Sequence, residues 1–317
     1  MRPISSRILL AGVAAVAATS LAACGGQASA DAAAGTETVS ITHAQGTTEV
    51  PVDPEKVVTF DIAALDTIDT LGVDEKSIAG APKKGLPEFL SGYAGDDYAN
   101  VGSVKEPDLE AVNAADPDLI IISGRTAGSY DDLSDIAPTI DLSVDSKNYV
   151  ESFSNVTESI GKIFDREDGA KSAIAELNSR IDETRTAGEK AGTGLIVMTS
   201  GGEVTAYGAG SRFGFIHDVL GVKTATDVKQ DGKHGESISF EYIAEANPDH
   251  LFVIDRDAAI GQSGEAASQV LDNDLVNGTS AAKNGKTVYL DSTSWYILGS
   301  GLTTVNSMVD EVAKGLG

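Results

Sequence analysis

The sequence predicts an α/β fold with two Rossmann-like lobes, each built on a parallel sheet, joined by one long α-helix. Three observations support this prediction: a helix–turn–strand unit that occurs twice, apolar runs of strand length that do not alternate, and one long amphipathic stretch between the two halves. Strands covered by helices on both faces are apolar throughout, so such runs are typical of parallel sheets. We expect the ligand site in a cleft between the lobes, where small-molecule sites commonly form.

The duplicated unit covers residues 108–125 and 239–256. In each copy a short helix is expected to end at an Asx-Pro-Asp turn, because the residue before proline is pushed out of the α region. An apolar strand follows. Four residues recur at one fixed offset: Glu110, Pro117, Asp118 and Arg125 as Glu241, Pro248, Asp249 and Arg256. Upstream, residues 68–73 and 217–222 repeat a helix end closed by glycine, so two halves of similar plan are predicted.

Other apolar runs complete the two predicted lobes. Further strands are expected at Val57 to Phe60, Leu195 to Met198, Val204 to Tyr207 and Thr287 to Leu290. Between the halves the apolar residues follow helical spacing, and Glu167 to Lys190 would form one helix about 36 Å long. We therefore place the first lobe at residues 38–147, a helical connection at 148–191 and the second lobe at 192–317.

The N-terminus indicates export. Two arginines precede an apolar run at residues 8–18 that is too short to span a bilayer, so residues 1–23 are interpreted as a signal peptide. Cys24, the only cysteine, directly follows Leu21-Ala22-Ala23 and resembles the bacterial lipobox, in which the cysteine is diacylated. We expect Cys24 to anchor the protein to the outer face of the cell membrane, with residues 24–37 as a flexible tether.

The composition argues against several classes of function. A formal net charge of −25 disfavours nucleic acid as a partner, because phosphate neutralisation needs an excess of lysine and arginine. The chain contains neither a Gly-x-Ser-x-Gly elbow nor a His-Glu-x-x-His zinc motif, and its one cysteine is assigned to the anchor. We therefore expect a monomeric binding protein and not an enzyme.

Three arginines form the candidate ligand site. Arg125 and Arg256 each lie just past the carboxyl end of a predicted strand, the edge at which α/β sheets bind ligands. Arg212 lies in a glycine-rich loop, residues 208–214, that enters a helix predicted at 215–220, where free N–H groups favour an anion. Desolvating three arginines together is costly unless the ligand brings negative charge, as a ferric centre wrapped by catecholates does.

Other residues are candidates for the same site. Lys84 is a candidate peripheral cation, and His234 and Tyr296 carry groups that bind Fe(III). From the pattern alone, His234 is interpreted as a loop histidine without a ligand, and Tyr296 as an aromatic residue packed on the cleft wall beside Trp295.

Taken together, these features resemble a known family. They comprise the lipobox, the doubled Glu…Pro-Asp-strand-Arg unit, the connecting helix, the Gly-Ser-Arg-Phe-Gly loop, His-Gly-Glu-Ser and Trp-Tyr. The combination is similar to the ferric-siderophore-binding lipoproteins of bacterial ABC importers, the class III periplasmic binding proteins. The resemblance covers nearly all of the chain beyond the signal peptide and is strongest to the branch that takes catecholate and mixed catecholate–citrate siderophores such as enterobactin fragments and petrobactin.

The resemblance implies roles for individual residues. Arg125, Arg212 and Arg256 match arginines that contact the catecholate oxygens. His234 and Tyr296 match positions that bind iron directly in some members.

Further implications concern the cargo and the partner. Lys84 and Trp295 are assigned to the ligand site. Glu110 and Glu241 match surface acids that dock into the permease, although each also falls in the first turn of a helix, where a carboxylate stabilises the dipole. The cargo is the Fe(III)-siderophore, and no resident cofactor is expected.

Other functions stay open at this point. A receptor of the same fold for haem or a corrinoid predicts an aromatic-walled cleft without three cations. A zinc or manganese receptor needs several converging histidines, and the chain has four: His43, His217, His234 and His250. A structural surface lipoprotein would leave the doubled arginines unexplained.

Overall fold

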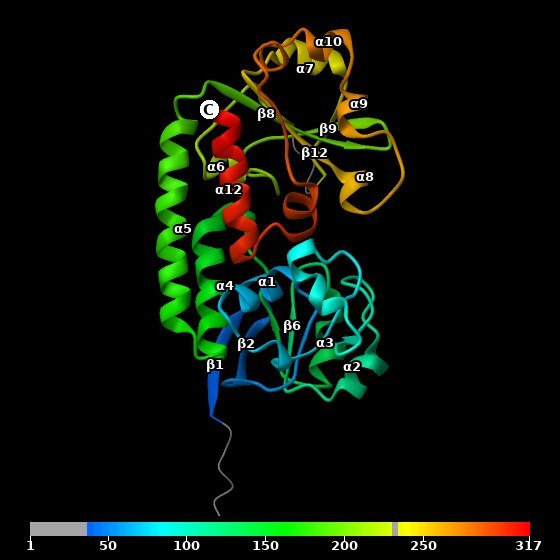
Figure 1. Cartoon of the computed structure of the whole chain (residues 1–317), viewed down its shortest axis with the longest axis vertical. Coiled ribbons are helices and arrows are strands. Elements are labelled where there is room, and N and C mark those ends of the chain that lie inside the picture. The colour runs from blue at the N-terminus through cyan, green and yellow to red at the C-terminus, as the bar shows by residue number, and fades with distance from the viewer. Residues whose placement is uncertain (1–36, 230–233) are drawn as a thin grey trace, which may run out of the picture. The chain divides into compact units, whose positions relative to one another are not determined.

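The computed structural model describes residues 37–229 and 234–317, and both halves of this part form one compact unit (Figure 1). The predicted signal peptide and Cys24 lie outside the described residues. Within the described ranges no helix is long and apolar enough to cross a bilayer.

The first half is built on a five-stranded parallel sheet with the order β5-β4-β3-β6-β7. Alternate residues of β6 belong to two different apolar clusters, Leu119 and Ile121 on one face and Ile120 and Ile122 on the other. The strands are β3 Val57–Thr59, β4 Ile78–Ala81, β5 Ala99–Asn100, β6 Leu119–Ile122 and β7 Thr139–Asp141, with the hairpin β1 Thr38–His43 and β2 Gly46–Pro51. The helices are α1 Ile62–Thr70, α2 Leu109–Ala115 and α3 Tyr130–Ser134.

The second half repeats the parallel core but adds antiparallel strands, with the order β11-β9-β8-β12-β13 and β10 beside β8. The strands are β8 Thr193–Ser200, β9 Glu203–Tyr207, β10 Lys223–Thr224, β11 Glu236–Ile238, β12 His250–Asp255 and β13 Thr287–Tyr289. The prediction of parallel sheets omitted the antiparallel pairing of β8 with β9. Gly201 and Gly202 join these two strands with φ of 58° and 81°, and so short a connection allows only an antiparallel hairpin.

The helices of the second half are short except for the last one. They are α6 Phe215–Asp218, α7 Phe240–Ala246, α8 Arg256–Ala259, α9 Ala267–Val270, α10 Asp274–Asn277, α11 Ser280–Lys283, the π-helix η5 Thr293–Leu298 and α12 Leu302–Leu316.

The two copies of the repeated unit have the same local structure. Asp108 caps α2 and Ser239 caps α7, and both helices end in the left-handed region, at Asp116 with φ 49° and Asn247 with φ 39°. Short polar side chains tolerate this conformation, so the chain can turn into proline and the next strand. The predicted helix–turn–strand plan is confirmed.

The aspartate after the repeated proline has one role in both copies. Asp118 Oδ2 accepts hydrogen bonds at 3.1 Å from the backbone N–H groups of Glu55 and Lys56, just before β3. Asp249 Oδ2 accepts one at 2.8 Å from the N–H of Thr193, where β8 begins. In each copy the carboxylate therefore links the turn after the helix to the start of another strand, β3 or β8. That strand pairs in parallel with the strand that follows the turn, β6 or β12.

Two helices connect the halves. α4 spans Tyr149–Ile163 and α5 spans Glu167–Gly188, two residues fewer than the predicted helix of 24. α5 contacts both α4 and the C-terminal helix α12, so the connection is packed along its length (Figure 1). The lobe boundaries at residues 38, 148 and 192 stay predictions.

A buried aspartate joins the two halves at the start of α12. This helix begins after Gly301, which has no side chain to cap it. Asp66 on α1 supplies the cap: its carboxylate accepts hydrogen bonds from Thr303 N–H at 3.0 Å, Thr304 N–H at 2.9 Å and Thr304 Oγ1 at 2.7 Å. A carboxylate is favoured here because free N–H groups and the helix dipole meet it.

We predict that Asp66→Ala lowers the free energy of unfolding by about 2 to 4 kcal/mol, because it leaves buried N–H groups of α12 without an acceptor. Urea unfolding followed by circular dichroism measures this. Glu176→Ala, which removes an exposed carboxylate from the middle of α5, is the control and should change stability by less than about 0.5 kcal/mol. Equal stability of the two variants would contradict the role of Asp66.

Candidate functional site

The candidate site residues follow strands of both sheets. Arg125 comes after β6 of the first half, and Arg256 begins α8 directly after β12 of the second half. Arg212 lies in the loop between β9 and α6. Tyr296 lies in the π-helix η5, which follows β13.

All three arginines meet at Tyr296. The carbonyl oxygen of Tyr296 accepts hydrogen bonds from Arg125 Nη2 at 2.7 Å and from Arg212 Nη2 at 3.0 Å. The Tyr296 hydroxyl lies 3.0 Å from Arg256 Nε, which donates to it. The three guanidinium carbons lie 5.7, 4.8 and 5.7 Å from the centre of the Tyr296 ring for Arg125, Arg212 and Arg256, within cation–π range. Guanidinium groups from both halves therefore surround one side chain.

The cluster changes the acidity of its own members. Burial by itself would raise the pKa of the Tyr296 phenol, but the hydrogen bond from Arg256 and the charges of all three arginines outweigh burial and lower this pKa. Partial burial and the charge of Arg212 lower the pKa of Arg125. The site therefore favours added negative charge, either as a phenolate or as an anionic ligand.

Among the residues that the structure describes, only Arg256 has a carboxylate within ion-pair distance. Arg256 Nη1 lies 3.6 Å from Asp257 Oδ1, whereas no carboxylate within the described ranges lies within 4 Å of Arg125 or Arg212. Asp61, at the N-cap of α1, is buried, and burial raises its pKa to about 6. Two guanidinium groups thus lack an ion-pair partner in the described part of the chain.

Lys84 does not join the cluster. It is exposed and makes no hydrogen bond or ion pair with any residue the structure describes. Its neighbour Lys83 donates to the carbonyls of Tyr93 and Gly95 and is held in its own loop. Contact between Lys84 and the ligand stays a prediction.

His234 is exposed in the loop before β11 and, within the described ranges, has no hydrogen bond to Tyr296. No group of three or more potential metal ligands gathers in this part of the chain. Among the described residues no hydrogen bond links the two predicted iron ligands, and ligation by His234 and Tyr296 stays a prediction.

Trp295 faces the protein core. Its side chain is 2% exposed, its indole Nε1 donates to Glu311 Oε2 at 2.8 Å, and its ring packs edge-on to Phe215. Neighbouring residues of a helix point in different directions, so Trp295 and Tyr296 do not share one surface. This placement argues against the predicted contact between Trp295 and the ligand.

The glycine-rich loop leads into a shorter helix than predicted, and anion binding at this helix N-terminus stays a prediction. α6 has four residues instead of the predicted six, and Asp218 Oδ2 accepts the N–H of Gly210 at 2.7 Å. The Asp218 carboxylate thus already accepts a hydrogen bond from the Gly210 N–H group of this loop. Arg212 contributes its side chain instead, with its guanidinium 4.6 Å from the Phe213 ring centre.

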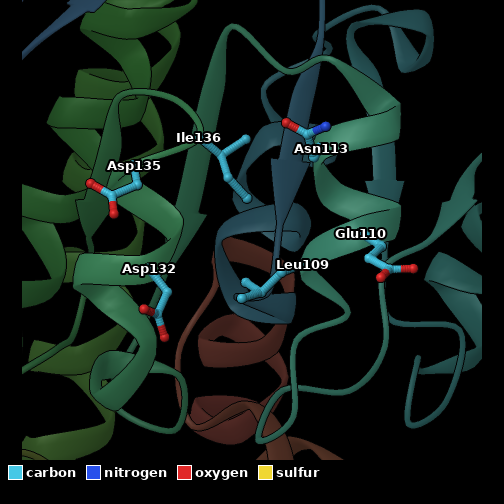
Figure 2. Close-up of a pocket in the computed structure, with 6 residues that line it drawn as sticks. All are labelled: Leu109, Glu110, Asn113, Asp132, Asp135 and Ile136. Carbon is cyan, nitrogen blue, oxygen red and sulfur yellow. The ribbon is translucent and has the colours of Figure 1, made fainter.

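Glu110 and Glu241 are exposed in the first turns of α2 and α7. The backbone N–H of Glu241 itself and, to a smaller extent, the Ser239 hydroxyl lower the pKa of Glu241. Beside Glu110 lies a hollow of about 440 Å³, in which Leu109 and Ile136 point inward and the carboxylates of Glu110 and Asp135 point apart at the rim (Figure 2). The hollow is lined by Leu109, Glu110, Asn113, Asp132, Asp135 and Ile136.

Sequence reasoning missed Ser200, Asp257 and Asp61, all of which lie near the arginines. Ser200 ends β8 and Asp257 follows Arg256, so both lie at the carboxyl edge of the second sheet. Any polar residue just after a predicted strand, and not arginine alone, lies at this ligand-binding edge of the sheet. The sequence could therefore have pointed to Ser200 and Asp257.

This fold and this cationic cluster define a two-lobed α/β binding protein. Residues 57–293 match the family model described as periplasmic binding protein, and the chain belongs to that family.

Particular members are similar over almost the whole chain. The petrobactin-binding protein YclQ of Bacillus subtilis is 46% identical over 96% of this chain and 97% of its own length. The ferric-anguibactin-binding protein FatB of Vibrio anguillarum is 33% identical over 87% of each chain. Among solved structures, YclQ matches with a TM-score of 0.85 over 88% of this chain and 99% of its own. The catecholate-siderophore-binding protein VctP of Vibrio cholerae matches with 36% identity and a TM-score of 0.82 over 87% and 99%.

We predict that Tyr296 ionises at a lower pH than an ordinary tyrosine, because the arginines favour its phenolate. The ultraviolet absorbance of tyrosinate, titrated against pH and taken as the difference between the protein and Tyr296→Phe, measures this. Tyr289→Phe is the control, since burial raises the pKa of Tyr289 and its difference signal should emerge above the ordinary range. The same midpoint for both difference curves would be inconsistent with the arginine effect.

Proposed function

We propose that this protein captures an anionic ferric siderophore, of the catecholate or mixed catecholate–citrate type, outside the cell membrane and delivers it to an ABC importer. The single observation that carries the proposal is the meeting of Arg125, Arg212 and Arg256 at Tyr296. The relatives named for petrobactin, anguibactin and catecholate siderophores support this choice of cargo.

The charge of the cluster matches this ligand class. Two of the three guanidinium groups lack a carboxylate partner in the described residues, and their present acceptor is one backbone carbonyl. A ferric tris-catecholate carries a charge of about −3, spread over ring oxygens that a guanidinium contacts two at a time and over rings on which it stacks. Haem or a corrinoid would leave most of this charge unmatched, so that alternative is not favoured.

Tyr296 is the proposed iron ligand when the siderophore is tetradentate and leaves two coordination positions of Fe(III) open, whereas a tris-catecholate fills all six. Its hydroxyl already lies among cations that favour the phenolate, the form that binds Fe(III). We propose His234 as the second ligand, brought in from its exposed loop when the complex binds, and Lys84 as a peripheral cation. The iron complex is the cargo, and we propose no resident cofactor.

Delivery is assigned to other residues. We propose that Glu110 and Glu241, one on each half and both exposed, dock onto cationic pockets of the permease, and that the protein acts as a monomer.

Cys24 is the proposed lipid anchor. Cys24→Ser should therefore release the protein from the membrane into the medium, as detected by immunoblotting of cell fractions.

We predict that intrinsic fluorescence falls on addition of a ferric catecholate, and that Arg125→Ala, Arg212→Ala and Arg256→Ala each weaken binding roughly tenfold to a hundredfold. This corresponds to about 1 to 3 kcal/mol for one charge-assisted contact. Arg166→Ala, an exposed arginine in the turn before α5, is the matched control and should bind as the parent does. A flat response to ferric catecholates together with a response to haem or a corrinoid would overturn the proposal.

We predict that Glu110→Arg and Glu241→Arg leave siderophore affinity unchanged but abolish iron uptake into cells, because charge reversal repels a cationic pocket. Uptake of the radiolabelled ferric complex measures this. Glu183→Arg, an exposed acid on α5, controls for the added positive charge. Normal uptake in both docking variants would refute the assignment of these glutamates.

A further inference from the structure

The arginine of the second repeat is held more firmly than that of the first. Arg256 Nη1 donates to Ser200 Oγ at 3.0 Å and lies 3.6 Å from Asp257 Oδ1, while its Nε donates to the Tyr296 hydroxyl. Arg125, at the equivalent place, makes one hydrogen bond with the residues that the structure describes, to the Tyr296 carbonyl. The guanidinium of Arg256 is therefore fixed along two edges.

The partners of Arg256 are themselves fixed. Asp257 is 8% exposed, and its Oδ2 accepts the N–H of Gly201 at 2.6 Å, in the tight turn between β8 and β9. The Ser200 hydroxyl lies 3.3 Å from Asp257 Oδ1 and donates to it. This leaves the serine oxygen lone pairs free to accept from Arg256. The turn, the serine and the aspartate thus form one hydrogen-bonded unit behind the guanidinium.

The two copies of the repeat differ at this point. The residue after Arg256 is Asp257, whereas the residue after Arg125 is Thr126, whose hydroxyl donates to the carbonyl of Val104 at 2.6 Å. The carboxylate is therefore a feature of the second copy alone. It lies on the wall of a hollow of about 400 Å³ that also includes the exposed residue Glu265.

We propose that Ser200 and Asp257 are positioning residues: they hold one edge of the Arg256 guanidinium so that its Nε meets the Tyr296 hydroxyl, and they thereby fix the phenol oxygen where iron is coordinated. The iron-binding part of this statement rests on the proposed function. The positioning of Tyr296 by Arg256 does not, because it exists in the ligand-free protein.

The geometry separates positioning from a simple charge effect. If Asp257 acted only as a nearby negative charge, it would disfavour the phenolate, and Asp257→Asn would lower the midpoint of Tyr296 ionisation. If it holds Arg256 against Tyr296, the same change frees the guanidinium, weakens its bond to the phenol and raises the midpoint. The two roles thus predict shifts of opposite sign.

The test is the tyrosinate titration of the ligand-free protein, with Tyr296→Phe as the reference for each variant. Ser200→Ala and Asp257→Asn should each raise the Tyr296 midpoint by about one pH unit, the size expected for one lost charge-assisted hydrogen bond. Ser200→Thr keeps a hydroxyl and should titrate as the parent does. Glu265→Gln removes a charge from the same hollow without touching Arg256 and should also leave the midpoint in place.

A lower or unchanged midpoint in Asp257→Asn overturns the positioning role. Should that variant fail to fold, as judged by circular dichroism, Ser200→Ala decides alone, since it removes one hydroxyl and no charge. Each variant that raises the Tyr296 midpoint should also bind the ferric catecholate about tenfold more weakly. Raised midpoints in a protein that binds no ferric siderophore would remove the proposed function alone. Siderophore binding with unmoved midpoints would remove the positioning role alone.

Discussion

Three guanidinium groups are held around one tyrosine, and the chemistry of this protein depends on how their mutual repulsion is balanced. Tyr296 offers two separate acceptors, its carbonyl to Arg125 and Arg212 and its hydroxyl to Arg256. Asp257 offsets the charge of Arg256. Two positive charges stay without an ionic partner among the described residues, and like charges this close favour an anionic guest strongly.

Such a cluster needs two halves at a fixed separation, because Arg125 belongs to one half and Tyr296 to the other. The Asp66 carboxylate on α1 caps α12, and α5 packs against both α4 and α12. A helix cap and a packed helix pair resist sliding better than an extended linker does. The hydrogen bond between Arg125 and the Tyr296 carbonyl can therefore persist without a ligand.

The duplicated scaffold carries an asymmetric site. Both copies tie their strands through the aspartate after proline, and both place an arginine after the strand. Asp257 follows the arginine in the second copy alone, and Tyr296 comes from a π-helix beyond the repeat. The surrounding chain carries a net charge of −25, so the cluster is a local positive field on an acidic molecule, which guides anionic ligands toward it.

From the sequence one could predict strands β3, β6, β8, β9, β12 and β13, the repeated helix ends and the arginines after β6 and β12. This was possible because apolar spacing, proline and capping residues act between neighbours in the chain. Tertiary packing alone decided that Tyr296 faces the arginines while Trp295 bonds to Glu311 in the core. These outcomes depend on helix rotation and on partners far along the chain, which no local pattern encodes.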